Sequence, residues 1–167
     1  MLWNAKNGSV KIDNTEMHYV SFGHGSKNLI VLPGLSDGLL TVKGKALLLA
    51  GAYTKYFNDY TVYMFSRKND MPEGYSIRDM AADQAKALQA LGITKTSVMG
   101  VSQGGMIVQF LAIDYPELVE KLIITVSAPR VNEMIHGNVS SWIEMARRGD
   151  HKSLMIDVAE KGYSEKY

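Results

Sequence analysis

The stretch from Lys95 to Tyr115 reads KTSVMGVSQGGMIVQFLAIDY, and it decides the fold of this chain. The part from Lys95 to Val101 is an apolar run of the length of a buried strand. The part from Gly104 to Tyr115 carries apolar residues at helical spacing. Between them, Gly100 to Gly104 fits the pattern Gly-x-Ser-x-Gly. A buried strand that turns sharply into a helix predicts a unit of an α/β fold.

The serine of this pattern, Ser102, has the position of a catalytic nucleophile. So sharp a turn accepts only small residues, usually glycines, two positions before and after the serine, and Gly100 and Gly104 meet that demand. The turn pushes the serine Oγ out of the sheet toward a substrate. The alternative is an ordinary glycine-rich turn in which Ser102 only caps the helix, but the flanking strand and helix favour the nucleophile.

Outward from this stretch, strands and helices alternate up to Pro129. A hairpin is expected at the start, a capping box at Ser76 begins the clearest helix, and Asp37 is a candidate cap for a helix-permissive segment. The alternation predicts a mostly parallel sheet with helices on both faces. The expected strands are 9–13, 17–22, 28–32, 60–65, 95–101 and 121–126, and the expected helices are 39–57, 77–91 and 104–115.

Beyond Pro129 the pattern changes to helix alone. One helical piece surrounds Trp142, another surrounds Leu154, and Gly149 with Asp150 marks the break between them. The sequence therefore predicts an α/β core over residues 1–130 and a helical segment over 131–167.

Composition excludes several classes of function. The chain has 18 Lys and Arg against 17 Asp and Glu, spread along its length, so nucleic acid is not an expected partner. With no cysteine there is no disulfide, thiolate metal site or thiol chemistry, and no metal or other cofactor is expected. No apolar run approaches the roughly 20 residues of a membrane span. The N-terminal residues do not resemble a signal peptide, so the expected compartment is the cytoplasm.

The order of these elements and the Gly100 to Gly104 motif resemble the α/β-hydrolase superfamily over residues 9–130. The resemblance implies that Ser102 is the nucleophile and that the backbone N–H groups of Gln103 and Leu35 form the oxyanion hole. Many members have His-Gly where this chain has Pro33 and Gly34, which changes the stiffness of that loop more than its chemistry. Alternatively, Leu35 is simply a loop residue that packs on the core.

The acid and base of the family's catalytic triad lie after later strands, which the sequence does not show. Residues 131–167 resemble the start of the helical cap that many members insert there, so the fold is expected to be interrupted midway. His18 and His24 precede the nucleophile and are expected to be structural. His136 and His151, with Glu133 and Asp150 nearby, stay open as candidates for the base, or are surface residues.

The loop of residues 66–74 departs from the family's usual segment and keeps only Arg67, which is expected on the surface or as a brace of the loop rather than as a substrate clamp. The expected activity is hydrolysis of an ester, thioester or similar acyl substrate through an acyl-enzyme. That activity is expected to be weak in this chain alone, because no base is assigned. The alternative is a non-catalytic module that binds a small molecule or a partner. An unpaired strand over 121–126 would pair with a second copy or a complementary chain.

Overall fold

The computed structural model describes residues 2–35, 41–68 and 70–162 of the chain. It divides into two compact units, Met1–Pro129 and Arg130–Tyr167. The candidate cap Asp37 and the first residues of the predicted 39–57 helix lie outside the described residues.

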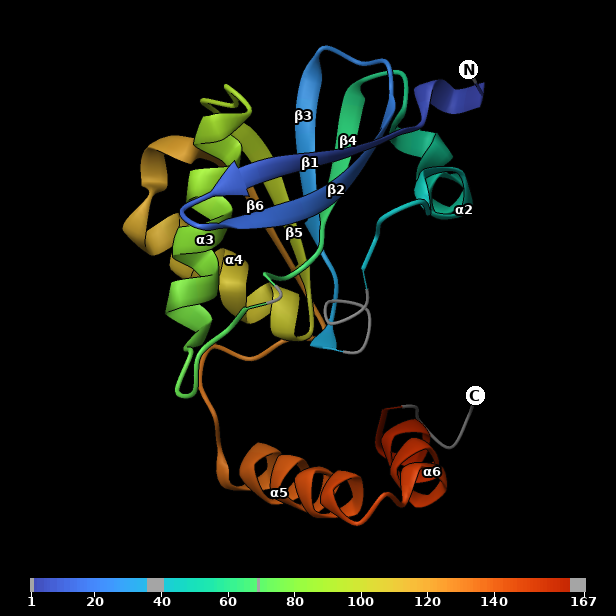
Figure 1. Cartoon of the computed structure of the whole chain (residues 1–167), viewed down its shortest axis with the longest axis vertical. Coiled ribbons are helices and arrows are strands. Elements are labelled where there is room, and N and C mark those ends of the chain that lie inside the picture. The colour runs from blue at the N-terminus through green and yellow to red at the C-terminus, as the bar shows by residue number, and fades with distance from the viewer. Residues whose placement is uncertain (1, 36–40, 69, 163–167) are drawn as a thin grey trace. The chain divides into compact units, whose positions relative to one another are not determined.

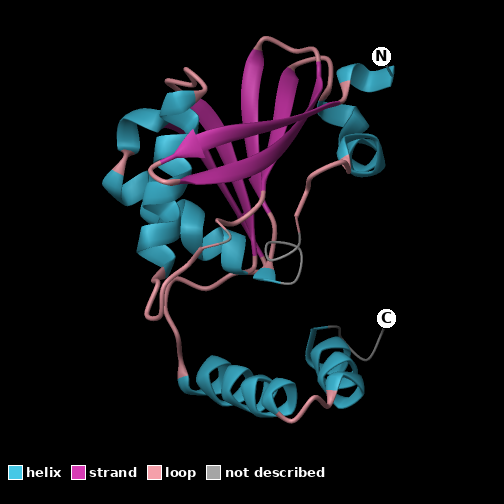
Figure 2. Cartoon of the chain, viewed as in Figure 1, coloured by secondary structure: helices cyan, strands magenta, loops and turns pink. Residues whose placement is uncertain are grey.

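The first unit is built on one six-stranded sheet (Figures 1 and 2). The strand order is β1-β2-β4-β3-β5-β6, in which β1 and β2 form the expected hairpin and β2 runs antiparallel to β4. The pairs β4–β3, β3–β5 and β5–β6 are parallel. The predicted α/β class with a mostly parallel sheet is therefore confirmed. The strands are β1 (Lys6–Ile12), β2 (Thr15–Gly23), β3 (Lys27–Leu32), β4 (Tyr60–Phe65), β5 (Thr96–Val101) and β6 (Val119–Thr125).

Helices cover both faces of this sheet, and β3 shows why its sequence is apolar throughout. Ile30 and Leu32 face the cluster that contains α3 (Ile77–Ala90) and α4 (Gln103–Asp114). Leu29 and Val31 face the other cluster, which contains α2 (Ala46–Ala50). Figure 1 shows α3 and α4 on one side of the sheet and α2 on the other. A strand covered on both faces needs apolar side chains at every position, which is the pattern read from the sequence.

Local sequence explains where the helices begin and end. Ser76 caps α3 through the expected capping box with Asp79, whose backbone N–H donates to the Ser76 Oγ at 3.1 Å. The predicted helix over 39–57 is shorter than expected, because regular α-helix is limited to α2 and a 3₁₀ segment follows at Gly51–Tyr56. Glycine destabilises a helix interior by about 1 kcal/mol relative to alanine, and α2 has no side-chain cap.

In the part of the second unit that the structure describes there are two helices, where the sequence predicted two helical pieces. They are α5 (Glu133–Arg147) and α6 (His151–Gly162). Asn132 caps α5 by accepting a hydrogen bond from the Ile135 N–H, and the Trp142 Nε1 donates to the Asp157 carboxylate at 2.6 Å, which joins the two helices. That these helices act as a cap stays a prediction. None of the described helices, in either unit, is long and apolar enough to cross a membrane.

The strand β6 lies at one edge of the sheet, beyond β5. Its apolar side chains are unusually exposed, since Leu122, Ile123 and Ile124 each expose more than a third of their surface. Among the described residues, no strand pairs with its outer side. An apolar edge of this kind is a template for pairing with another strand.

Candidate active site

The turn between β5 and α4 holds Ser102 in a strained backbone conformation. Its φ is 53° and its ψ is −119°, outside the regions that residues other than glycine normally occupy. Such strain persists only where the surrounding structure over-determines it, and it gathers at functional sites. The strand, the strained serine and the helix together have the geometry of a nucleophile elbow.

Hydrogen bonds to β6 and to the residues just after it hold this turn in place. The Ser102 N–H donates to the carbonyl oxygen of Thr125 at 3.0 Å, which continues the β5–β6 pairing by one residue. The Ser127 Oγ donates to the Ser102 carbonyl at 2.7 Å, and the Thr125 Oγ1 donates to the Gly100 carbonyl at 3.2 Å. These bonds are formed only by the folded sheet, so tertiary structure stabilises the strained serine.

The glycines around Ser102 allow a close approach of backbones. A Cβ on Gly104 would overlap the carbonyl oxygen of Leu32, and a Cβ on Gly100 would lie 2.6 Å from the Gly105 Cα. A Cβ on Gly105 would in turn overlap the side chain of Ser127. Because the obstacles at Gly100 and Gly104 are backbone atoms, no larger residue fits there without moving a strand or the helix.

Two backbone regions meet at Ser102, and both carry predicted oxyanion donors. Gln103 is the first residue of α4, so its N–H has no acceptor within the helix and lies at the positive end of the helix dipole. Gly34 lies against the nucleophile, since a Cβ there would be 3.4 Å from the Ser102 Cβ and 3.9 Å from its Oγ. The next residue, Leu35, exposes 51% of its surface, which does not fit the alternative of a core-packed residue. Its role as a donor stays a prediction.

A pocket of about 310 Å³ lies beside Gly34 and Val101, next to Ser102. It lies on the α2 side of the sheet and is mainly aliphatic, with a few polar side chains. Such a surface accepts an apolar group rather than a strongly charged one. The lining includes Pro33, Gly34 and Val101 beside the nucleophile, the apolar residues Val31, Val42, Leu48, Leu49, Ala52 and Met64, and the polar residues Thr41, Lys45 and Tyr53.

The two histidines of the first unit are not placed to activate Ser102. His18 lies on β2, and the strand order puts β4 and β3 between β2 and β5. Three strand spacings amount to about 14 Å, well beyond hydrogen-bond reach. His24 follows β2 where its N–H donates to the Phe57 carbonyl, at the end of the sheet where β4 begins rather than where it ends. Both positions agree with the structural role expected from the sequence.

The other two histidines belong to the second unit and have exposed side chains. His136 lies in α5, and His151 is the first residue of α6. The neighbouring carboxylate of Asp150 accepts hydrogen bonds from Ser153, which lower its pKa, so it caps α6. Neither the acid nor the base of a triad is assigned by the structure. Among the described residues there is also no cluster of three side chains suited to hold a metal ion.

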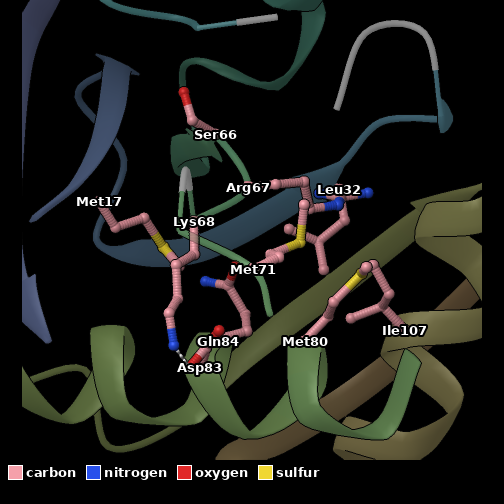
Figure 3. Close-up of a pocket in the computed structure, with 10 residues that line it drawn as sticks. All are labelled: Met17, Leu32, Ser66, Arg67, Lys68, Met71, Met80, Asp83, Gln84 and Ile107. Atoms are coloured by element: carbon pink, nitrogen blue, oxygen red, sulfur yellow. Dashed lines mark ion pairs between the residues drawn. The ribbon is translucent and has the colours of Figure 1, made fainter. Parts of the chain in front are cut away.

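The structure corrects the expectation that Arg67 is a surface residue. Arg67 exposes only 7% of its surface, and its Nη2 donates to the carbonyl oxygen of Pro33 at 2.7 Å. The other expectation, that it braces a loop, is confirmed. Figure 3 shows Arg67 beside Leu32 on the wall of a small cavity that side chains of α3 and α4 close from below. Sequence reasoning missed this burial because an arginine in a polar loop has no local pattern that indicates a buried partner.

Comparisons with known proteins agree with this geometry. Residues 27–155 match the model of the family described as the alpha/beta hydrolase fold. The human serine hydrolase BPHL is 30% identical over 149 residues, which cover 83% of this chain and 51% of the relative. Epoxide hydrolase 1 of Caenorhabditis elegans is 26% identical over 139 residues, covering 83% of this chain and 34% of the relative.

Solved structures show the same fold. The alpha/beta hydrolase enzyme MGS-M2, from a Medee basin deep-sea metagenome library, superimposes with a TM-score of 0.82 at 15% sequence identity, covering 95% of this chain and 58% of that one. At that identity the likeness concerns the fold alone. The chain spans about half the length of the human relative and of this structure.

Proposed function

Since this chain belongs to the alpha/beta hydrolase fold family, we propose that it carries the nucleophile of a serine hydrolase that acts on an ester, thioester or similar acyl substrate. The single observation that supports this proposal most is the strained backbone of Ser102 between β5 and α4. A serine that only capped a helix would adopt an ordinary extended conformation at this position. The strained backbone is explained if it presents the Ser102 Oγ to a substrate.

The proposed reaction forms and then hydrolyses an acyl-enzyme. The Ser102 Oγ attacks the substrate's carbonyl carbon while its proton passes to a base, and the N–H groups of Gln103 and Leu35 stabilise the negative charge on the carbonyl oxygen. The base returns this proton to the departing alcohol or thiol, and water then attacks the acyl-enzyme, which releases the carboxylic acid and restores the serine. The pocket beside Gly34 and Val101 would hold the apolar part of the substrate.

The base of this reaction is not assigned, and this limits the expected rate. A serine without a base is a poor nucleophile, so we expect this chain to react slowly by itself. His136 and His151 are the two histidines that the strand order does not exclude. That no base is assigned also favours a second candidate function, a non-catalytic module that binds a small molecule in the pocket or a partner protein.

The test is labelling with a fluorophosphonate probe, followed by intact-mass analysis. The expected result is slow labelling that reaches one probe per chain at Ser102, is lost in Ser102→Ala and is retained in Ser140→Ala, a control at an exposed serine of α5. Loss of labelling in His136→Ala or His151→Ala would identify the base. A chain that binds an apolar ester reversibly but never becomes labelled would contradict the hydrolase and support the binding module.

We also propose a partner for the exposed edge of the sheet. The apolar strand β6 has a free outer side among the described residues, and its backbone groups there are available for pairing. A strand from a second copy or from a complementary polypeptide would pair with these backbone groups, extend the sheet and place its own side chains beside Leu122, Ile123 and Ile124.

A further inference from the structure

Arg67 is a buried cation bonded to Pro33, the residue before the Gly34 that lies against the nucleophile. It follows β4 by two residues and is more than nine-tenths buried. Burial lowers the pKa of its guanidinium to about 10, so the group keeps its charge at neutral pH. Among the described residues it forms no ion pair with a carboxylate, and its Nε has no hydrogen-bond partner.

An apolar side chain would fill this space at a lower desolvation cost, since a buried charge without a counter-ion is unfavourable. Within the described ranges, the hydrogen bond that Arg67 makes goes to the backbone carbonyl of Pro33, at 2.7 Å. A charged donor forms a stronger bond than a neutral one, and a buried bond is stronger than an exposed one. The charged guanidinium therefore holds the Pro33 carbonyl in place more strongly than a neutral donor would.

That carbonyl belongs to the peptide that leads into the candidate oxyanion hole. The peptide between Pro33 and Gly34 is planar and trans, so fixing its carbonyl also fixes the plane of the Gly34 N–H. Gly34 is the residue that lies against the Ser102 side chain. The φ of Pro33 is restrained by its ring, and Leu35 follows Gly34. The direction of the Leu35 N–H therefore depends on the peptide that Arg67 holds and on the φ and ψ of Gly34.

The residue before Arg67 holds the other side of the same loop. The Ser66 Oγ accepts a hydrogen bond from the Val42 N–H at 2.9 Å, and both residues are buried. Pro33 and Val42 stand on the two sides of the segment that connects β3 to α2. Two consecutive residues after β4 thus anchor both the incoming and the outgoing backbone of that segment.

We propose that Ser66 and Arg67 form a clamp on the described ends of the loop that connects β3 to α2, at Val42 and at Pro33, with Arg67 as the positioning residue that directs the Leu35 N–H toward Ser102. The catalytic part of this inference rests on the proposed hydrolase function, whereas the clamp itself does not. Neither side chain needs to touch substrate. The clamp predicts that each hydrogen bond controls its own side of the loop and leaves the elbow helix α4 unchanged.

The experiment that separates these statements is backbone NMR of the full chain and its variants. In Arg67→Met, the order parameters of Gly34 and Leu35 should fall from about 0.85 to below 0.6, and the Pro33 carbonyl shift should change. In Ser66→Ala, amide exchange at Val42 should rise about tenfold, as expected for one buried hydrogen bond. Arg78→Met, which removes a surface arginine of α3, is the matched control and should alter neither region.

Arg67→Lys keeps the charge and is included in case Arg67→Met does not fold; it should restore part of the order at Gly34. The clamp is wrong if Gly34 and Leu35 stay as rigid in a folded Arg67 variant as in the unchanged chain. Fluorophosphonate labelling of the same samples tests whether Arg67 acts on the reaction of Ser102. If the unchanged chain is labelled, Arg67→Met should slow the bond-forming step about tenfold with little change in probe affinity. Labelling of the variant at the unchanged rate would overturn the positioning role, and an unlabelled parent chain would refute the hydrolase while leaving the NMR result to decide the clamp.

Discussion

Replacing Gly104 by alanine tests the close packing that shapes the elbow. The added Cβ would overlap the Leu32 carbonyl oxygen and lie 2.7 Å from the Pro33 carbonyl oxygen. These are backbone atoms at the end of β3, which is hydrogen-bonded to β4 on one side and β5 on the other. β3 cannot move without breaking those hydrogen bonds, and α4 cannot move without losing its packing on the sheet. Because the obstacles are backbone atoms, no side-chain rotation relieves the clash.

The expected magnitude follows from two opposing effects. Overpacking a well-packed interior costs about 1–3 kcal/mol, and a clash with backbone atoms belongs at the upper end of that range. Alanine is favoured over glycine in a helix by about 1 kcal/mol, which offsets part of the cost. The net free energy of unfolding should fall by about 2 kcal/mol. For a chain of this size, that corresponds to a thermal midpoint lowered by about 4–8 °C.

The assay is thermal and urea unfolding followed by circular dichroism, with Gly137→Ala as the matched control. Gly137 also lies in a helix, α5, but a Cβ there would meet no atom within 4 Å. The control gains helix propensity without a clash, so its midpoint should equal or exceed that of the unchanged chain. If Gly104→Ala melts as late as the unchanged chain, the close approach of α4 to β3 is not what restricts this position, and the steric reasoning is refuted.

Two further predictions concern the surface of the first unit. Arg78 donates two hydrogen bonds to Asp114, and they lower the pKa of the Asp114 carboxyl below its usual 3.8. Their contribution to stability is therefore present above pH 3.8 and is lost as the pH falls through the lowered pKa. Asp114→Asn should weaken the loss of stability at acid pH measured by urea unfolding, and an unchanged loss would contradict this prediction. Ile123→Lys should lower the molar mass measured by light scattering toward that of the monomer, because a charge on β6 discourages pairing at the sheet edge. The same molar mass with and without the substitution would argue against the proposed edge contact.

Short-range patterns were enough to locate most of the secondary structure. The run from Leu29 to Leu32 predicted a strand buried on both faces, and Ser76 with Asp79 predicted the start of α3, because such signals depend only on neighbouring residues. Where tertiary context competes, the prediction was less accurate. The strand β1 begins at Lys6 rather than Ser9, since backbone hydrogen bonds to β2 extend it through exposed polar residues that carry no apolar pattern.

The candidate site likewise contains residues that the sequence predicted and contacts that it did not. Ser102, Gly100 and Gly104 lie next to one another in the chain, so their spacing alone predicted an elbow. The burial of Arg67 and its bond to Pro33 join residues 34 positions apart, and no periodicity in either segment indicates that they meet.

By itself, the sequence determined the class of fold, the order of strands and helices, and the serine at the turn, because these depend on side-chain size, polarity and spacing along the chain. Only the tertiary structure decided that β3 lies between β4 and β5, that Gly34 meets Ser102, and that Arg67 is buried against Pro33. Those contacts arise when strands distant in sequence pair side by side and both faces of the sheet are covered. The backbone register that brings them together is a property of the whole sheet rather than of any one segment.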